Sequence, residues 1–159
     1  HIKTILLIRH AKSDWPEGVE DFDRPLTKTG EENALRMANF LKNKSVNIDT
    51  FISSPAKRAQ DTCALFSKVF NKNFSTEHQL YNAREQHFEN VIYGLPKDSN
   101  CVAIFSHNNG ISNFANYLTD EIINLPTCGV AAYQVDCEDW SDFEMANKKF
   151  LYFYSPKNI

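Results

Sequence analysis

Two arginines and two histidines are the side chains best suited to chemistry in this sequence: Arg9, His10, Arg58 and His107. Arginine forms paired, charge-assisted hydrogen bonds to phosphate oxygens. A neutral imidazole can attack phosphorus and hold the phosphoryl group covalently until water removes it. His10 would then be the nucleophile, kept neutral with the help of nearby guanidinium groups, and His107 would stabilise the charge on the phosphoryl oxygens. The four residues therefore predict a pocket for a doubly charged tetrahedral group such as phosphate.

Each of these residues follows, within a few positions, a segment that is expected to form a buried strand. The first arginine and histidine follow Ile5–Ile8, the second arginine follows Phe51-Ile52, and the second histidine follows Cys101–Phe105. Ligands of open α/β sheets bind beyond the carboxyl ends of the strands. If these three strands are parallel neighbours, all four side chains meet at one edge of the sheet.

The helix that carries Arg58 is expected to begin with Ser54 as its N-cap and Pro55 as its first residue. Lys57 and Arg58 then lie in the first turn, where the helix dipole disfavours cations. A bound anion would offset this cost, and helix N-termini favour phosphate. We expect Lys57 to be solvated and Arg58 to face the anion.

The remaining segments alternate between helix and strand, which favours a layered α/β fold. Apolar side chains at helical spacing predict helices around residues 34–41, 59–70, 88–92 and 111–118. Further strands are expected at 74–80, as a polar edge, and at 130–135 and 150–154, which could form a hairpin across a solvated acidic turn at 136–142. The expected architecture is a three-layer sandwich with a mainly parallel central sheet, helices on both faces and an antiparallel edge.

The sequence lacks the motifs of other common phosphate-binding and phosphatase mechanisms. It contains no G-x-x-x-x-G-K-[ST] phosphate loop and no cysteine followed six positions on by arginine. No pair of acids follows the first strand, as a magnesium site would require. We therefore expect a histidine-based mechanism with no metal and no cofactor.

Composition narrows the class of protein further. At 159 residues, with 42% hydrophobic residues, the chain is expected to form one globular domain, residues 1–159. A net charge of −3 without a Lys/Arg run argues against nucleic-acid binding, and the short apolar runs argue against a membrane span. The four cysteines form no C-x-x-C pair and match no zinc spacing, which indicates a reduced, cytoplasmic protein.

The segment Leu7–Ala11 resembles the signature of the histidine phosphatase superfamily, also called phosphoglycerate-mutase-like, whose usual form is Arg-His-Gly. The resemblance extends through Asp23–Thr27 with Gly30, through Ser53–Ala56 with Arg58, Ala59 and Thr62, and through Ser106–Asn108. The short length, without a capping insertion between Leu80 and His107, is similar to the small SixA-type phosphohistidine phosphatases.

The resemblance implies a role for each matching residue. His10 is the expected nucleophile, and Arg9, Arg58 and His107 complete the phosphate pocket. Asn108 is expected to touch the phosphate or to shape the loop. The other histidines, His1, His78 and His87, are expected to carry no function, and Trp15 and Trp140 to serve in packing or as loop anchors.

The sequence departs from the family pattern at the general acid. Mutases and many esterases of the superfamily carry a glutamate where this chain has Asn82. Glu85, Asp21 and Asp23 are alternative donors. Because the imidazole of phosphohistidine leaves more readily than an alkoxide, loss of the acid favours an N-phosphorylated substrate.

The expected function is that of a phosphatase working through phospho-His10, with protein phosphohistidine as the favoured substrate. Two alternatives remain open: a phosphatase for small phosphate esters on the same fold, and a non-catalytic module that binds phosphate or phosphoprotein. The expected partner is thus a phosphorylated protein or small molecule, and the sequence does not fix the oligomeric state.

Overall fold

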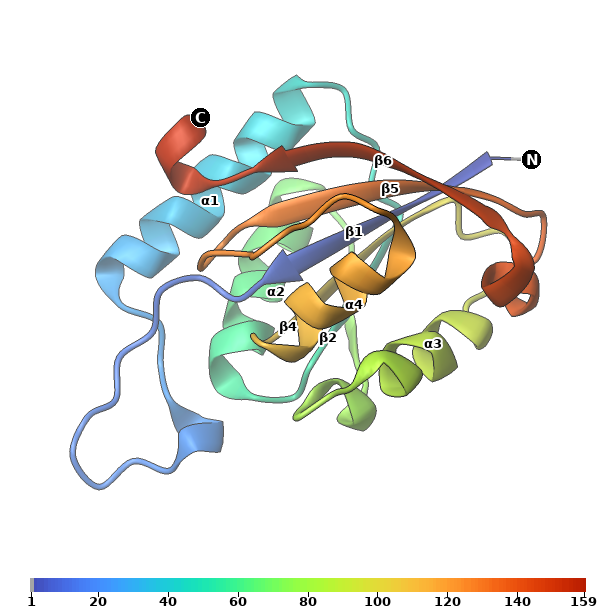
Figure 1. Cartoon of the computed structure of the whole chain (residues 1–159). Helices are drawn as coiled ribbons and strands as arrows, with labels where there is room; N and C mark the ends of the chain where they lie inside the picture. The colour runs from blue at the N-terminus through green and yellow to red at the C-terminus, as the bar shows by residue number, and fades with distance from the viewer. Residues whose placement is uncertain (1) are drawn as a thin grey trace.

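A six-stranded sheet forms the centre of the protein, as a computed structural model of residues 2–159 describes it (Figure 1). The strand order is β3-β2-β4-β1-β5-β6. The strands are β1 (Ile2–Arg9), β2 (Thr50–Ser53), β3 (Ser75–Thr76), β4 (Cys101–Ser106), β5 (Val130–Asp136) and β6 (Asn147–Tyr154). The first four strands in this order are parallel, whereas β5 pairs antiparallel with β1 and with β6. His1 lies outside the described residues.

Helices cover both faces of this sheet. They are α1 (Lys28–Asn43), α2 (Lys57–Val69), α3 (Glu85–Tyr93) and α4 (Gly110–Leu118). Buried residues of α1 and α2 belong to one hydrophobic cluster, and those of α3 and α4 belong to the other. The predicted three-layer fold, with a mainly parallel sheet and an antiparallel edge, is therefore confirmed.

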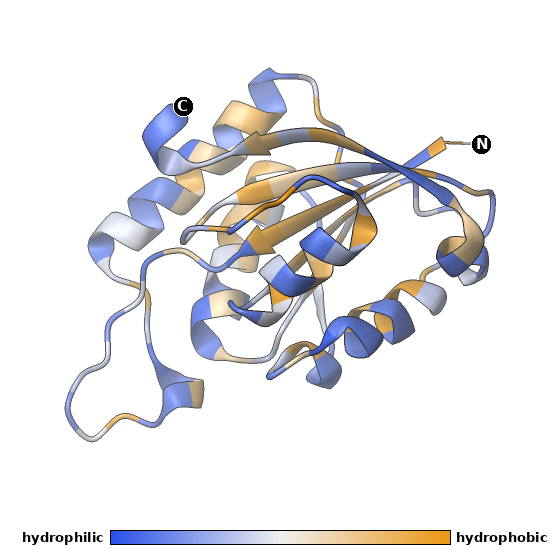
Figure 2. Ribbon diagram, in the orientation of Figure 1, coloured by the Kyte–Doolittle hydropathy of each residue, from blue (hydrophilic) through white to orange (hydrophobic). Residues whose placement is uncertain are grey.

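The central strand β1 is buried on both faces because its apolar residues alternate between the two clusters. Leu6 and Ile8 belong to the cluster of α1 and α2, whereas Ile5 and Leu7 belong to the cluster of α3 and α4, and all four are fully buried. Burial of each such side chain contributes about 1.5–3 kcal/mol. Figure 2 shows the result as hydrophobic strands between helices whose outer faces are hydrophilic.

Three expectations about local structure need correction. The polar edge strand expected at 74–80 lies at the edge of the sheet but spans only Ser75–Thr76 (β3), and a 3-10 helix follows at His78–Leu80. Helix α2 begins at Lys57 with Ala56 as N-cap, although the Ser54 hydroxyl still accepts the N–H of Ala56 and also binds His107. The acidic segment after β5 is not a simple solvated turn: it contains a 3-10 helix, Trp140–Met145, whose Trp140 and Phe143 are fully buried.

All four cysteine thiols are free. Cys63 and Cys128 are buried and Cys101 is half-buried. Burial raises the pKa of the Cys63 thiol, and it raises the pKa of Cys101 and of Cys128 to about 12. These thiols therefore stay protonated at neutral pH.

No helix among residues 2–159 is both long enough and apolar enough to cross a bilayer.

The start of α4 lies very close to the chain that precedes α3. A Cβ on Gly110 would sit 2.1 Å from the carbonyl oxygen of Ala83, a main-chain atom that cannot rotate away. We expect Gly110→Ala to lower the free energy of unfolding by about 1–3 kcal/mol, because the two segments must separate. Urea unfolding followed by circular dichroism measures this change.

Gly94→Ala is the matched control. There the new Cβ would meet Val91 O at 3.7 Å, an ordinary contact, so its cost should stay within about 0.5 kcal/mol. Equal unfolding free energies for the two variants would contradict the close approach at Gly110.

Candidate active site

His10 lies directly after β1, and its backbone and side chain are both fixed by main-chain atoms. Its N–H donates to Ser106 O at 3.1 Å, and only 6% of the residue is exposed. Its Nδ1 lies 2.7 Å from the carbonyl oxygen of Ala11. Because a carbonyl can only accept, Nδ1 carries the hydrogen in this bond and Nε2 keeps its lone pair. The ring is thereby prepared to use Nε2 as a base or nucleophile.

The surroundings of His10 also keep the ring uncharged. Burial lowers the pKa of His10 to about 4, and the guanidinium groups of Arg58, Arg9 and Arg24 act in the same direction. The hydrogen bond to Ala11 opposes this shift without cancelling it. The sequence had suggested nearby arginines as the cause, but removal from water is the larger effect.

Arg9 and Arg58 each direct part of their guanidinium group to protein partners. Arg9 Nη1 donates to Leu125 O at 3.1 Å. Arg58 Nη1 and Nη2 donate to the main-chain oxygen of Asp21 at 2.7 Å and to its Oδ2 at 3.2 Å. The Nε atoms of both arginines are buried and have no hydrogen-bond partner among residues 2–159. These N–H groups are available to bind an anion.

His107 follows β4 and faces His10, with 5.3 Å between the ring centroids. Its Nε2 lies 2.7 Å from Ser54 Oγ, and that oxygen also accepts the N–H of Ala56 at 3.2 Å. If the Ser54 hydroxyl gives its own hydrogen to Nε2, the ring hydrogen of His107 lies on Nδ1. Nδ1 is buried without a partner in the described chain, so this N–H is a further donor for an anion. Burial, followed by His10 and Arg58, lowers the pKa of His107 to about 3.

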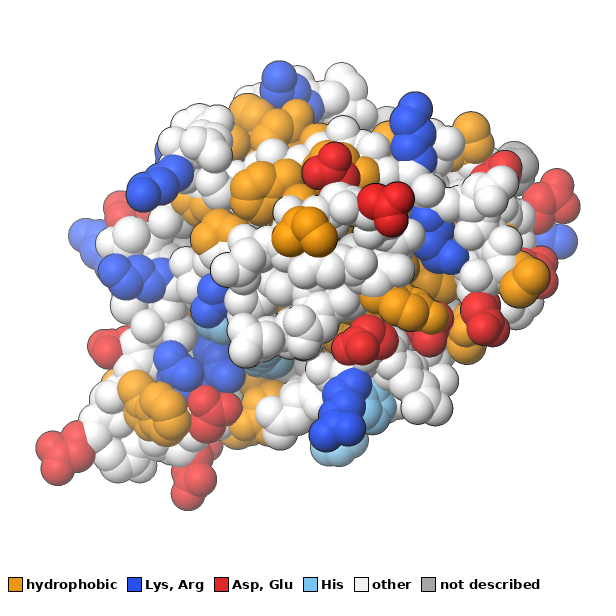
Figure 3. Space-filling view, in the orientation of Figure 1, with side chains coloured by type: hydrophobic (Ala, Val, Ile, Leu, Met, Phe, Trp, Pro, Cys, Tyr) orange, Lys and Arg blue, Asp and Glu red, His pale blue; other side chains and the backbone are white. Residues whose placement is uncertain are grey.

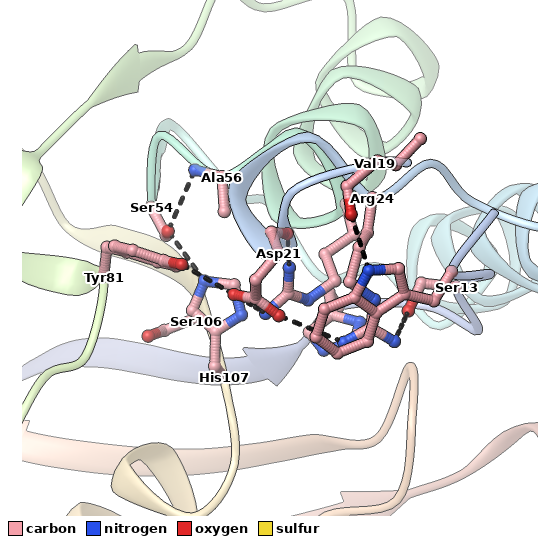
Figure 4. Close-up of polar contacts among 12 residues, drawn as sticks. Ser13, Val19, Asp21, Arg24, Ser54, Ala56, Tyr81, Ser106 and His107 are labelled. Carbon is pink, nitrogen blue, oxygen red and sulfur yellow. Dashed lines mark hydrogen bonds and ion pairs between the residues drawn. The ribbon is translucent and has the colours of Figure 1, made fainter. Parts of the chain in front are cut away.

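A network on the loop between β1 and α1 closes one side of the site (Figure 4). The Asp21 carboxylate accepts hydrogen bonds from Tyr81 Oη at 2.6 Å, Arg58 Nη2 at 3.2 Å and Arg24 Nη1 at 3.3 Å. The bond from Tyr81 is the largest cause that lowers the pKa of Asp21. Arg24 in turn lies over the Trp15 ring, 4.7 Å from its centroid. Asp21 is thus an ionised counter-charge to Arg58.

The alternative proton donors, Asp21, Asp23 and Glu85, lie in different surroundings in the structure. Asp21 lies in the network, ionised and without a proton to give. Asp23 is exposed and outside these contacts. Asn82 and Glu85 line a cavity that also contacts His107.

Asn108 is held by hydrogen bonds to its neighbours. Its Nδ2 donates to Asn124 Oδ1 at 3.2 Å, and its Oδ1 accepts a short bond from Ser112. Ser112 Oγ accepts the N–H of Leu125, whose carbonyl binds Arg9. These bonds tie Asn108 to the loop that holds Arg9, and its contact with phosphate stays a prediction.

The four residues chosen from the sequence thus come together, but several of their partners were not foreseen. Tyr81 is the neighbour of Asn82 in the sequence, and this adjacency is the signal that could identify it. Ser54 resembles a helix cap in the sequence, and no local pattern points to Leu125. His87 accepts the N–H of Arg84 at the start of α3, a structural role. No group of three or more His, Cys, Asp or Glu residues within 2–159 is placed to hold one metal ion.

A family model described as the histidine phosphatase superfamily (branch 1) matches residues 5–101. The chain belongs to this superfamily. The match begins within β1 and ends at the first residue of β4, so it includes Arg9, His10 and Arg58 and stops before His107.

Relatives and solved structures extend this result. An uncharacterized chloroplastic protein of Arabidopsis thaliana is 29% identical over 88% of this chain and 70% of its own length. A 2,3-bisphosphoglycerate-dependent phosphoglycerate mutase of Nitrosomonas europaea is 29% identical over 53% of this chain and 37% of the mutase. A Nakamurella multipartitia chain assigned as the phosphohistidine phosphatase SixA has a TM-score of 0.86 at 21% identity, over 98% of this chain and 97% of that one. The protein histidine phosphatase SixA complexed with tungstate has a TM-score of 0.83 at 23% identity, over 98% of both chains. These structures share the fold of this chain.

The bond between Ser54 and His107 predicts a single tautomer of His107. We expect nitrogen-15 NMR to find the hydrogen on Nδ1 in the wild type and a mixture of tautomers in Ser54→Ala. Because Nδ1–H is then only partly available, Ser54→Ala should bind inorganic phosphate about tenfold more weakly, as measured by calorimetry. Ser53→Ala is the matched control, since that buried hydroxyl donates to Ser54 O and does not reach the ring. An unchanged tautomer in Ser54→Ala would overturn this assignment.

The lowered pKa values of His10 and His107 predict that the protein loses stability in mild acid. In the unfolded chain histidine titrates near pH 6.5, whereas folded His10 and His107 titrate at about 4 and 3. Between pH 6.5 and 4 the unfolded state therefore binds more protons, and the free energy of unfolding falls as the pH falls, by up to about 1.4 kcal/mol per pH unit for each histidine. Urea titrations at several pH values measure this slope. In His10→Gln the slope should decrease by about 1.4 kcal/mol per pH unit, which corresponds to one proton fewer taken up on unfolding. An equal slope in both proteins would contradict the burial of a neutral His10.

Proposed function

We propose that this protein is a phosphatase that hydrolyses its substrate through a covalent phosphohistidine on His10. The observation that carries the proposal is the hydrogen bond from His10 Nδ1 to Ala11 O, which leaves the Nε2 lone pair free in a pocket of cationic donors. A module that only binds phosphate would gain nothing from a neutral imidazole held in this way.

The proposed reaction has two displacements at phosphorus. In the first, His10 Nε2 forms a bond to phosphorus while the bond to the leaving group breaks and its electron pair departs with that group. In the second, the oxygen of a water molecule attacks phosphorus, the electron pair of the N–P bond returns to Nε2, and the water gives up a proton to solvent. Phosphate leaves and His10 is again neutral.

Arg9, Arg58 and His107 hold the phosphoryl oxygens in this proposal. The Nε–H of each arginine and the Nδ1–H of His107 are donors fixed in place before the substrate arrives. Donors that need no rearrangement stabilise the charge that develops in the transition state most effectively. The proposed cycle uses these protein groups and includes no metal or cofactor.

Protein phosphohistidine is the substrate class that we favour. Asn82 stands where related mutases carry an acid, and Asp21 is ionised. An imidazole protonated on its far nitrogen leaves phosphorus as a neutral molecule and needs no donor at the breaking bond, whereas an alkoxide does. The fold shared with SixA agrees with this choice, and the partial match to a mutase keeps small phosphate esters as the alternative.

A comparison of His10→Ala with the wild type tests the mechanism. Both proteins are given a phosphohistidine-bearing protein and an aryl phosphate, and each reaction is quenched to trap any phosphoenzyme. The wild type should accumulate an acid-labile, base-stable adduct, and His10→Ala should lose at least about 1,000-fold in kcat/KM, the scale on which nucleophile loss acts in other enzymes. His78→Ala is the matched control, because His78 is exposed and lies outside the site.

Turnover that is unchanged in His10→Ala would exclude the proposed intermediate. Hydrolysis of sugar or nucleotide phosphates as fast as that of phosphohistidine protein would instead favour the small-ester alternative.

A further inference from the structure

A cavity of about 280 Å³ lies beside the phosphate pocket and shares His107 with it. Its walls come from residues 82–85 and from the first turn of α4. The two walls lie close together at Gly110, where a Cβ would sit 2.1 Å from the carbonyl oxygen of Ala83. A group leaving from phosphorus on the His107 side would enter this cavity, which we call the amide cavity.

Uncommitted amides give the amide cavity its character. Asn82, Asn109 and Asn113 line it, are exposed, and make no side-chain hydrogen bond within residues 2–159. Each amide offers both a donor and an acceptor. Asn108 also borders the cavity, but its oxygen and one amide hydrogen are already bonded.

Charge distinguishes the amide cavity from the opposite side of the site. The loop side carries the ionic network of Asp21, Arg24 and Arg58. The lining of the amide cavity contains one cation, Arg84, and one anion, Glu85, which are neighbours in the sequence. Their charges cancel and His107 is neutral, so the lining carries no net charge. In Figure 3, pale-blue histidine is visible between charged side chains on one side and white, uncharged surface on the other, beyond which further charged side chains lie.

This lining is suited to a polypeptide main chain. Every peptide unit other than proline presents one donor and one acceptor, which an asparagine side chain can match regardless of the sequence. A second phosphate, as in a bisphosphate or a nucleotide, would require further cations, because phosphate is bound by guanidinium and ammonium groups.

We propose that the amide cavity binds the main chain of the peptide segment that carries the phosphohistidine. This proposal rests on the proposed function and deepens it, because it assigns the leaving group to a protein and gives it a binding site of its own. Recognition through main-chain groups would admit phosphohistidines in different sequence contexts, with the phosphoryl group as the common feature.

The test compares two P–N substrates that differ only in what occupies the amide cavity. Phosphoramidate releases ammonia and leaves the cavity unused, whereas a short phosphohistidine peptide fills it. Asn109→Leu and Asn113→Leu keep the side-chain size and remove the hydrogen bonds. In each variant the ratio of kcat/KM for the peptide to kcat/KM for phosphoramidate should fall about tenfold, mainly through a higher KM for the peptide.

Asn73→Leu is the matched control. Asn73 is an exposed asparagine just before β3, at the opposite end of the parallel strands, and its substitution should leave the ratio unchanged. Because the measure is a ratio, a variant that folds poorly lowers both activities and does not imitate the expected result.

The outcomes separate this inference from the proposed function. If the wild type hydrolyses neither phosphoramidate nor the phosphohistidine peptide in a His10-dependent way, the proposed function fails, and the inference fails with it. If it hydrolyses both, and the ratio is unchanged in both leucine variants, only the assignment of the amide cavity is overturned. A glucose phosphate whose KM rises in the variants while that of the peptide does not would show that the cavity binds a sugar instead.

Discussion

The parallel pairing of β4 with both β1 and β2 is the constraint on which the site depends. Arg9 lies opposite Ser106, and Ser53 lies opposite Phe105, so the three strands end in step. The residues that follow them, His10, Ser54 and His107, therefore leave the sheet at one edge and within reach of one another. A shift of one residue in either register would turn these side chains to opposite faces and separate the two rings.

The site combines two demands that oppose each other. Holding an anion requires cations, whereas a histidine nucleophile must stay neutral beside them. Burial satisfies both, because it disfavours a charged imidazole while the arginines keep their charge. The hydrogen bond of His10 to the carbonyl of Ala11 then decides which nitrogen of that ring carries the hydrogen.

The three-layer fold could be predicted from the sequence because apolar runs such as Ile5–Ile8 identify buried strands. The proximity of Arg9, His10, Arg58 and His107 could be predicted because these residues follow the ends of such strands. Local signals failed where tertiary partners compete for the same atoms. Ser54 has the features of an N-cap, yet its hydroxyl binds His107, which is 53 positions away. Asp21 depends likewise on Tyr81, 60 positions away, and no local pattern encodes such a contact.

The cysteines give the protein a further property. Cys63 and Cys128 are protonated thiols buried in the protein, Cys101 is a half-buried protonated thiol, and the proposed chemistry belongs to an imidazole. Peroxide and alkylating reagents act on exposed thiolates, which is how they disable enzymes with a cysteine nucleophile. A phosphatase built in this way keeps its reacting atom outside the reach of cellular redox signals, so dephosphorylation by it would continue under oxidative stress.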